Sequence, residues 1–174
     1  SELRAYIDGK ISLPAKSVIV TFDDGGISMF KEGLPILNKY KIPATQFMIG
    51  KYDALSKMCT YASPYISFQS HSYNMHFPDT LTSGESHHQI GKLSKSEIIA
   101  DLTANRDIVG NNHAFAYPYG DYTPDARSAL RDMGVLCSFT IKRGKVYPGD
   151  DPTILKRIGV YNTTDFDTFV AGLN

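Results

Sequence analysis

The sequence predicts one α/β domain whose strands form a parallel sheet or barrel, and three observations support this. Short apolar segments typical of buried strands alternate with longer segments that have helical periodicity. The 174 residues, 42% of them hydrophobic, are enough for one sizeable core and too few for two independent ones. Polar residues with catalytic or ligating chemistry follow several predicted strands, where such folds build their sites.

The first half of the chain contains three predicted strands and one predicted helix. The strands are "SVIVTF" at 17–22, "ATQFMIG" at 44–50 and "YISFQSH" at 65–71. Apolar residues recur near helical spacing over 28–41, although Gly33 and Pro35 weaken this helix. A long segment rich in polar residues, glycine and histidine then runs from about Phe77 to Leu93.

The second half of the chain has clearer helix boundaries. Ser94 and Glu97 have the S-x-x-E form of a capping box, and apolar residues at helical spacing follow them. Thr123 and Pro124 are a typical N-cap and first helical residue, and Gly134 is expected to end that helix. The remaining predicted elements are strands at 114–117, 135–141 and 154–160 and a helix at 164–173.

Reactive or turn-forming residues follow three of the predicted strands. Asp23 and Asp24 come after the first strand, His71 ends the third, and the run Pro118–Gly120 comes after the fourth. The carboxyl ends of parallel strands meet at one edge of a sheet or barrel, which is where its site is built. We therefore expect these residues to lie close together.

Two histidines and one aspartate at this edge have the chemistry of a metal site. His71 and His76 are five residues apart, which does not fit a helical H-E-x-x-H site but fits one ligand at a strand end and one in the following loop. Two imidazoles and a carboxylate form the three-ligand set of a catalytic zinc centre that leaves a fourth position open. A cation there would also explain the adjacent carboxylates of Asp23 and Asp24, which otherwise repel each other.

Each part of this pattern has a simpler explanation when taken alone. An Asp-Asp pair after a strand is usually a turn or a helix cap, and histidines in a polar loop are usually solvated. Phosphoryl transfer on an aspartate is disfavoured, because the residue two positions after Asp23 is Gly25 and no phosphate-binding motif is present. The combination at three strand ends is what favours a metal site.

Composition excludes some classes of partner. Lysine plus arginine and aspartate plus glutamate number 18 each, so no charge bias indicates nucleic acid or an anionic membrane surface. We find no apolar run near the roughly 20 residues that span a bilayer. We expect Cys59 and Cys137 to be free thiols rather than one disulfide, and we expect a monomer.

Three motifs, "TFDDG", "SHSYNMH" and "FAYPYG", resemble those of the polysaccharide deacetylase family with the NodB homology domain (carbohydrate esterase family 4). The resemblance runs from Val18 to about Val160 and is greatest to the branch of poly-N-acetylglucosamine deacetylases. It implies that residues 1–174 form a single NodB-like domain with a distorted, incomplete (β/α) barrel. It also implies an extracellular or cell-surface bacterial hydrolase that removes N-acetyl groups from peptidoglycan, poly-N-acetylglucosamine or chitin-like oligomers.

The resemblance implies a role for each motif residue. Asp23 would be the base that takes a proton from a metal-bound water, and Ser72 would steady the loop of the metal site. The metal would be one divalent ion, with zinc favoured over cobalt or nickel. The metal ligands would be Asp24, His71 and His76. The backbone N–H of Tyr119 would stabilise the oxyanion, and the turn residues Pro118 and Gly120 would contribute to substrate binding.

The sequence departs from the family pattern in two places. Many members carry an arginine shortly before the proline of the third motif, where it orients the base, and here that position is Phe115. Arg157 on a late strand is our candidate for that role, with a surface arginine as the alternative. The late Leu-x-His motif that supplies the general acid in many members is missing, because no histidine follows His113.

The general acid is therefore left open by the sequence. His87, His88 and His113 are the remaining histidines, and we expect each to be a solvated loop residue. The alternative for His87 or His88 is that the segment after the metal motif folds back and brings one of them to the site as the acid. Asp23 itself is the other candidate for returning the proton. A metal-binding or glycan-binding relative with weakened catalysis is the alternative function, although a site that only bound metal would not need the second carboxylate.

Overall fold

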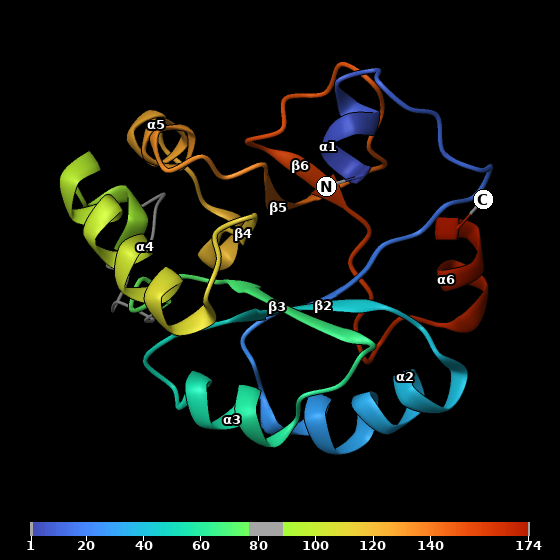
Figure 1. The fold of residues 1–174 in the computed structure, drawn as a ribbon. Coiled ribbons are helices and arrows are strands. Elements are labelled where there is room, and N and C mark those ends of the chain that lie inside the picture. The colour runs from blue at the N-terminus through green and yellow to red at the C-terminus, as the bar shows by residue number, and fades with distance from the viewer. Residues whose placement is uncertain (1, 77–88, 174) are drawn as a thin grey trace.

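The protein folds around one curled sheet of six parallel strands that forms an incomplete barrel (Figure 1). The computed structural model describes residues 2–76 and 89–173. Neighbours in the sheet follow the order of the chain, so β1 and β6 are its two edges. The strands are β1 (Val20–Phe22), β2 (Ala44–Met48), β3 (Ile66–Ser70), β4 (Ala114–Ala116), β5 (Cys137–Arg143) and β6 (Leu155–Arg157). The incomplete (β/α) barrel expected from the sequence is confirmed.

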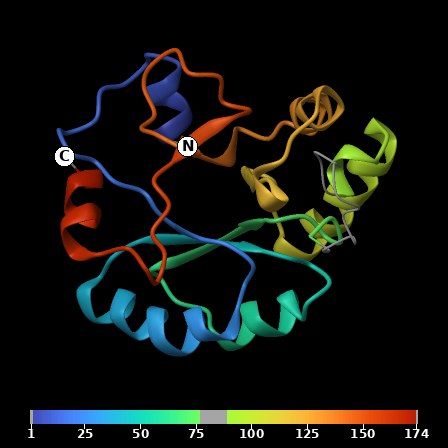
Figure 2. The ribbon, with the colours of Figure 1, turned by 180° about the vertical axis from the view of Figure 1, so that it is seen from behind.

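Helices cover the outside of this sheet. In both ribbon views α2 and α3 lie on the outer side of β2 and β3, and α4 and α5 lie side by side next to β4 (Figures 1 and 2). The α-helices are α1 (Glu2–Ile7), α2 (Leu34–Tyr40), α3 (Ala54–Thr60), α4 (Lys95–Val109), α5 (Pro124–Asp132) and α6 (Phe166–Leu173). Shorter helical segments are η1 (Met29–Gly33, π-helical), η2 (Gln89–Gly91) and η3 (Pro118–Gly120).

Every strand and helix predicted from hydrophobic periodicity is present, but the boundaries differ. The helix expected over 28–41 consists of the π-helical segment η1 and the α-helix α2. Pro35 lies in the first turn of α2, and its missing N–H interrupts the hydrogen bonding of a continuous α-helix there. The sequence analysis missed α1 and α3, which have six and seven residues and therefore give little periodicity.

Buried side chains fall into three clusters. One lies inside the barrel and includes Phe47, Phe139 and Ile7 of α1. A second fills the space between β4 and the helices α4 and α5, and a third packs α2 and α3 against β2 and β3. The thiols are free as expected, with Cys59 exposed and Cys137 buried. Among the described residues, no helix is both long and apolar enough to cross a membrane.

Both predicted helix starts are confirmed. The side chain of Ser94 accepts a hydrogen bond from the Glu97 N–H, and the Glu97 carboxylate accepts one from the Ser94 N–H, which completes the capping box of α4. Thr123 Oγ1 accepts a hydrogen bond from the Ala126 N–H at 3.1 Å, so it caps α5. These caps fix where the two helices begin beside β4.

We predict that Thr123→Ala lowers the free energy of unfolding by about 1 kcal/mol, because an N–H at the start of α5 loses its acceptor. Thermal unfolding should shift down by roughly 2–4 °C for a chain of this length. Thr163→Ala is the control, since Thr163 is an exposed residue in a turn. Equal melting temperatures for the two variants would contradict the capping role.

Candidate active site

Four strand ends bring predicted site residues to one edge of the barrel. Asp23 and Asp24 follow β1, His71 follows β3 directly, Tyr119 lies in η3 after β4, and Arg157 is the last residue of β6. All strands are parallel, so these positions are the carboxyl ends that the sequence analysis identified.

Asp24, His71 and His76 converge on one point. The Nε2 atoms of His71 and His76 both lie 3.2 Å from the same carboxylate oxygen of Asp24. One potential ligand atom from each residue lies within 4.8 Å of the other two. The loop therefore brings His76 back to the strand-end residue His71, as a shared metal site requires.

His71 is held in an orientation that suits a metal ligand. Its side chain is 2% exposed, and its Nδ1 lies 2.7 Å from the carbonyl oxygen of Ala116. A carbonyl oxygen only accepts hydrogen bonds, so Nδ1 carries a proton, and Nε2 is the ring nitrogen that faces Asp24. Ligating histidines are typically held in this way by a second hydrogen bond. The backbone N–H of His71 also donates to the carbonyl of Met48 on β2.

The charge states of the other two residues also suit a metal site. Burial, followed by the proximity of His71, lowers the pKa of His76, which favours its neutral imidazole. The hydrogen bond with His71 lowers the pKa of Asp24 and favours its carboxylate, against the opposing effect of burial. Imidazole nitrogens and a carboxylate are donors that zinc and similar divalent ions prefer. These residues therefore fit a divalent cation.

Arg157 holds the carboxylate of Asp23 in a bidentate ion pair. One guanidinium nitrogen donates to Asp23 Oδ1 at 2.8 Å and the other donates to Oδ2 at 2.7 Å. Arg157 is itself fixed, because its Nε donates to the carbonyl of Thr140 at 3.0 Å and its side chain is 16% exposed. The structure thus brings Arg157 to Asp23, as the sequence analysis expected, and this paired geometry sets the orientation of the carboxylate.

The strand-end loops have backbone conformations that are unusual for residues other than glycine. Asp24, Ser72 and Tyr119 have φ values of 71°, 71° and 57°. Such conformations cost energy and are common at functional sites. Ser72 Oγ accepts the Met75 N–H at 3.1 Å, which is the loop-steadying contact that the resemblance implied for Ser72.

Glycine is required at position 120, which follows Tyr119. Its φ is 76°, and an added Cβ would lie 2.4 Å from Ile141 Cγ1 and 2.9 Å from the Ile141 backbone nitrogen. Pro118 is buried at the start of the same turn. The ring of Tyr119 stacks on His76 with ring centres 4.4 Å apart, so this turn packs directly against the Asp24–His71–His76 group.

Three positioning side chains were missed by the sequence analysis. Gln46 is fully buried on β2, and its Nε2 donates to the carbonyls of Phe22 and Asp23. Lys57 on α3 donates to the carbonyl of Gly25, in the turn after Asp24. Asp101 on α4 accepts backbone N–H groups of the loop between the two histidines. Only Gln46 leaves a signal in the sequence, as an amide within a mainly apolar strand.

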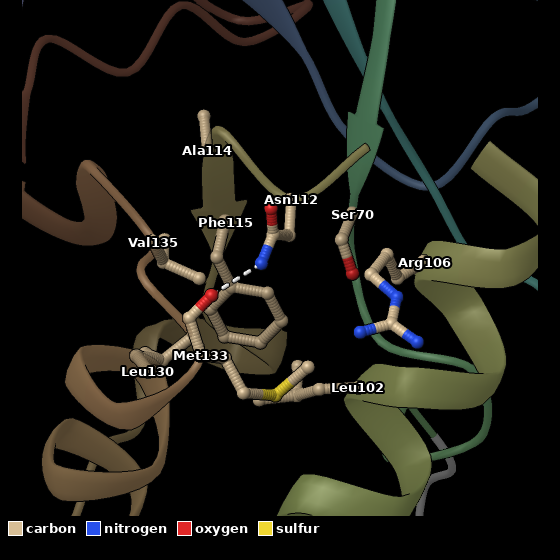
Figure 3. Close-up of a pocket in the computed structure, with 9 residues that line it drawn as sticks. All are labelled: Ser70, Leu102, Arg106, Asn112, Ala114, Phe115, Leu130, Met133 and Val135. Carbon is tan, nitrogen blue, oxygen red and sulfur yellow. Dashed lines mark hydrogen bonds between the residues drawn. The ribbon is translucent and has the colours of Figure 1, made fainter. Parts of the chain in front are cut away.

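Phe115 has no part in the site. It is 1% exposed and faces the layer formed by α4 and α5, where a cavity of about 10 Å³ lies among mainly apolar side chains (Figure 3). Asn112 closes one side of this cavity by donating to the carbonyl of Met133. The space holds one water molecule at most. A larger cavity of about 360 Å³ lies between Arg4 of α1 and Arg131 of α5, outside the group of site residues.

The remaining histidines divide into two groups. His113 is exposed and precedes β4, so it lies at the opposite end of that strand from the site. This position agrees with the solvated residue that we expected. His87 and His88 lie outside the described residues, so the prediction for them stays a prediction.

Comparison with known proteins identifies the family. The sequence profile described as "Polysaccharide deacetylase" matches residues 10–137, which include both aspartates after β1 and both histidines of the convergent group. This chain belongs to the polysaccharide deacetylase family. The match covers most of the chain but ends before Arg157.

One curated protein and two solved structures are similar to this chain. It is 28% identical over 170 residues to the poly-beta-1,6-N-acetyl-D-glucosamine N-deacetylase of Staphylococcus aureus, which covers 88% of this chain and 57% of that protein. The structure of IcaB from Ammonifex degensii matches with 26% identity and a TM-score of 0.75, over 98% of this chain and 78% of that one. The Streptococcus pyogenes deacetylase PplD matches with 23% identity and a TM-score of 0.79, over 99% and 76%.

These matches confirm the NodB-type fold expected from the sequence. The likeness to PplD is below 25% identity and is evidence of fold alone. The chain spans a little over half the length of the Staphylococcus aureus relatives that it matches.

We predict that the purified protein binds close to one equivalent of divalent metal, and that His76→Ala reduces this strongly because the site loses one of its three donors. Elemental analysis after dialysis, followed by zinc titration of the apo protein, measures both. His113→Ala is the matched control, because His113 is exposed and lies at the other end of its strand. Full metal content in His76→Ala would contradict the assignment.

Proposed function

We propose that this chain is a metal-dependent hydrolase that removes N-acetyl groups from N-acetylglucosamine polysaccharide, with Asp23 as its general base. The observation that carries the proposal is an oriented carboxylate, that of Asp23, on the residue that precedes Asp24 of the Asp24–His71–His76 group. A site that only stored metal would have no use for a second carboxylate fixed by its own arginine.

The residues of the site divide the chemistry among them. Asp24, His71 and His76 would hold the divalent cation, most suitably zinc, with cobalt and nickel as alternatives. When bound, such a cation polarises the acetamide carbonyl and lowers the pKa of water towards neutrality. Asp23 takes the proton of the attacking water, and Arg157 keeps the carboxylate of Asp23 in the orientation that this transfer needs.

The turn after β4 is suited to bind the reacting carbonyl. The Tyr119 ring stacks on His76, so the backbone of Pro118–Gly120 lies beside the metal ligands. We assign to the Tyr119 backbone N–H the stabilisation of the developing oxyanion, and to Pro118 and Gly120 the shape of the substrate turn. One donor of this kind typically contributes about 3–4 kcal/mol to lowering the barrier.

Asp23 is the described residue best placed to return a proton to the leaving amine. Among the described residues, the histidines at this edge are the two ligands, and His113 lies at the opposite end of β4. A base that has taken a proton from water can deliver it to the amine when the carbon–nitrogen bond breaks. The same shortage of histidines favours the alternative function, a metal-binding or glycan-binding relative with weakened catalysis.

The relatives suggest the polymer to test first. The Staphylococcus aureus relative is named for poly-β-1,6-N-acetyl-D-glucosamine. We extend that substrate to this chain, with peptidoglycan and chitin-like oligomers as the other acetamide-bearing polymers. An extracellular or cell-surface location follows from such a substrate. We also propose that residues 1–174 form a single NodB-like domain, that this domain acts on the polymer as a monomer, and that nucleic acid is not a partner.

We predict that the protein releases acetate from N-acetylglucosamine oligomers and that a chelator abolishes the release until zinc is added back. Asp23→Asn should lower kcat by about 10²-fold or more, because the base is lost while the shape of the side chain is kept. Acetate is measured enzymatically on the three polymers, with Asp125→Asn, an exposed acidic residue of α5, as the control. Zinc binding without acetate release from any polymer would favour the binding-protein alternative.

Removing the ion pair on the base should affect catalysis more than folding. We predict that Arg157→Ala lowers kcat by roughly 10- to 100-fold, because Asp23 loses the two charge-assisted hydrogen bonds that orient it, and alters the pH profile of kcat. Arg157→Lys should restore only part of the rate, because an ammonium group does not reproduce the bidentate geometry. Full activity with an unchanged pH profile in Arg157→Ala would remove this role.

A further inference from the structure

We propose that Asp101, on α4, is a positioning residue that sets the spacing of the two metal-ligand histidines. This inference rests on the proposed function. One carboxylate oxygen of Asp101 accepts the Tyr73 N–H at 2.7 Å, and the other accepts the Asn74 N–H at 2.8 Å. Tyr73 and Asn74 are the central residues of the loop that joins His71 to His76.

The loop between the histidines is held from two sides. On one side, the carbonyls of Ser72 and Tyr73 accept the N–H groups of Gly50 and Lys51, in the segment after β2. On the other side, the N–H groups of Tyr73 and Asn74 donate to Asp101. The contact from Ser72 Oγ to the Met75 N–H lies within the loop, whereas Asp101 connects the loop to a helix. The carboxylate therefore transmits the position of α4 to both ligands.

The helix that carries Asp101 is itself firmly placed. Ile98 and Leu102, which flank Asp101 on α4, are 1% and 4% exposed in the core beside β4. Asn105, one turn further along, is fully buried and donates to the carbonyl of Met48 and to Ser70 Oγ, at the ends of β2 and β3. Residues at i and i+4 lie on one face of a helix, so this polar face of α4 contacts both the strand end before His71 and the loop after it.

A neutral amide cannot replace the carboxylate in this contact. Two backbone N–H groups need two acceptors, and an asparagine offers one oxygen and one NH₂ group, so one N–H would face a donor. Burial raises the pKa of Asp101, which the two backbone N–H groups oppose. Outer partners that orient metal ligands typically change metal affinity by about 10- to 100-fold when they are mutated.

Zinc titration of the apo protein tests the proposal. We expect Asp101→Asn to weaken zinc binding by about 10- to 100-fold, and to change the visible absorption of the cobalt-substituted protein because the ligand geometry is altered. Asp107→Asn is the matched control: it lies on the same helix, is exposed, and pairs with the adjacent Arg106. Asp107→Asn should bind zinc like the unmodified protein, and melting curves of the apo forms verify folding.

The outcomes separate this inference from the proposed function. Failure of the unmodified protein to bind zinc would refute the proposed function and, with it, this role of Asp101. Equal zinc affinities of the unmodified protein and Asp101→Asn would overturn the role of Asp101 alone. Amide hydrogen exchange in the unmodified apo protein gives a test that needs no variant. We expect the Tyr73 and Asn74 amides to be protected, and exchange as fast as in an exposed loop would overturn the proposal.

Discussion

The ion pair between Arg157 and Asp23 joins the two edges of the sheet. β1 and β6 are not neighbours in the strand order, so they are not connected by the hydrogen bonds of the sheet. Arg157 at the end of β6 reaches across to Asp23 and also to Thr21 Oγ1 on β1, at 3.3 Å. A partly buried, bidentate pair has both the geometry and the strength for this task. One contact between the two edges of the sheet is thus the same contact that orients the proposed base.

The adjacent aspartates illustrate how neighbouring residues in a chain acquire different environments. Asp24 turns towards the two histidines, and its positive φ directs the backbone away from the line of β1. Asp23 instead faces an arginine from the other edge of the sheet. Each carboxylate therefore has its own positive or ligating partner, and the repulsion expected between adjacent charges is offset on both sides.

The sequence was sufficient to predict the strands, the helix caps and the residues that converge at the strand ends. This worked because parallel strands place their carboxyl ends together whatever the details of packing. It also led to Arg157, since the arginine expected near Phe115 was absent and Arg157 lay on a late strand.

The positioning side chains could not be predicted in the same way. Lys57 and Asp101 lie on helices, and their spacing there does not distinguish them from solvated charged residues. Their partners are backbone groups 32 and 28 residues away in the chain, so only the packing of α3 and α4 against the sheet defines the contacts. The π-helical start of the second helical segment was missed for a similar reason, because periodicity alone does not separate it from an α-helix.

The positive φ angles at Asp24, Ser72 and Tyr119 have a consequence for protein engineering. Each residue occupies a conformation that glycine would adopt at lower cost, by about 1 kcal/mol, so glycine substitutions there look attractive to a designer who seeks heat resistance. Yet these positions supply a proposed ligand, a loop contact and a ring that stacks on His76. Thermostable versions of this domain should therefore be sought through substitutions on its helices, with these three loops left unchanged.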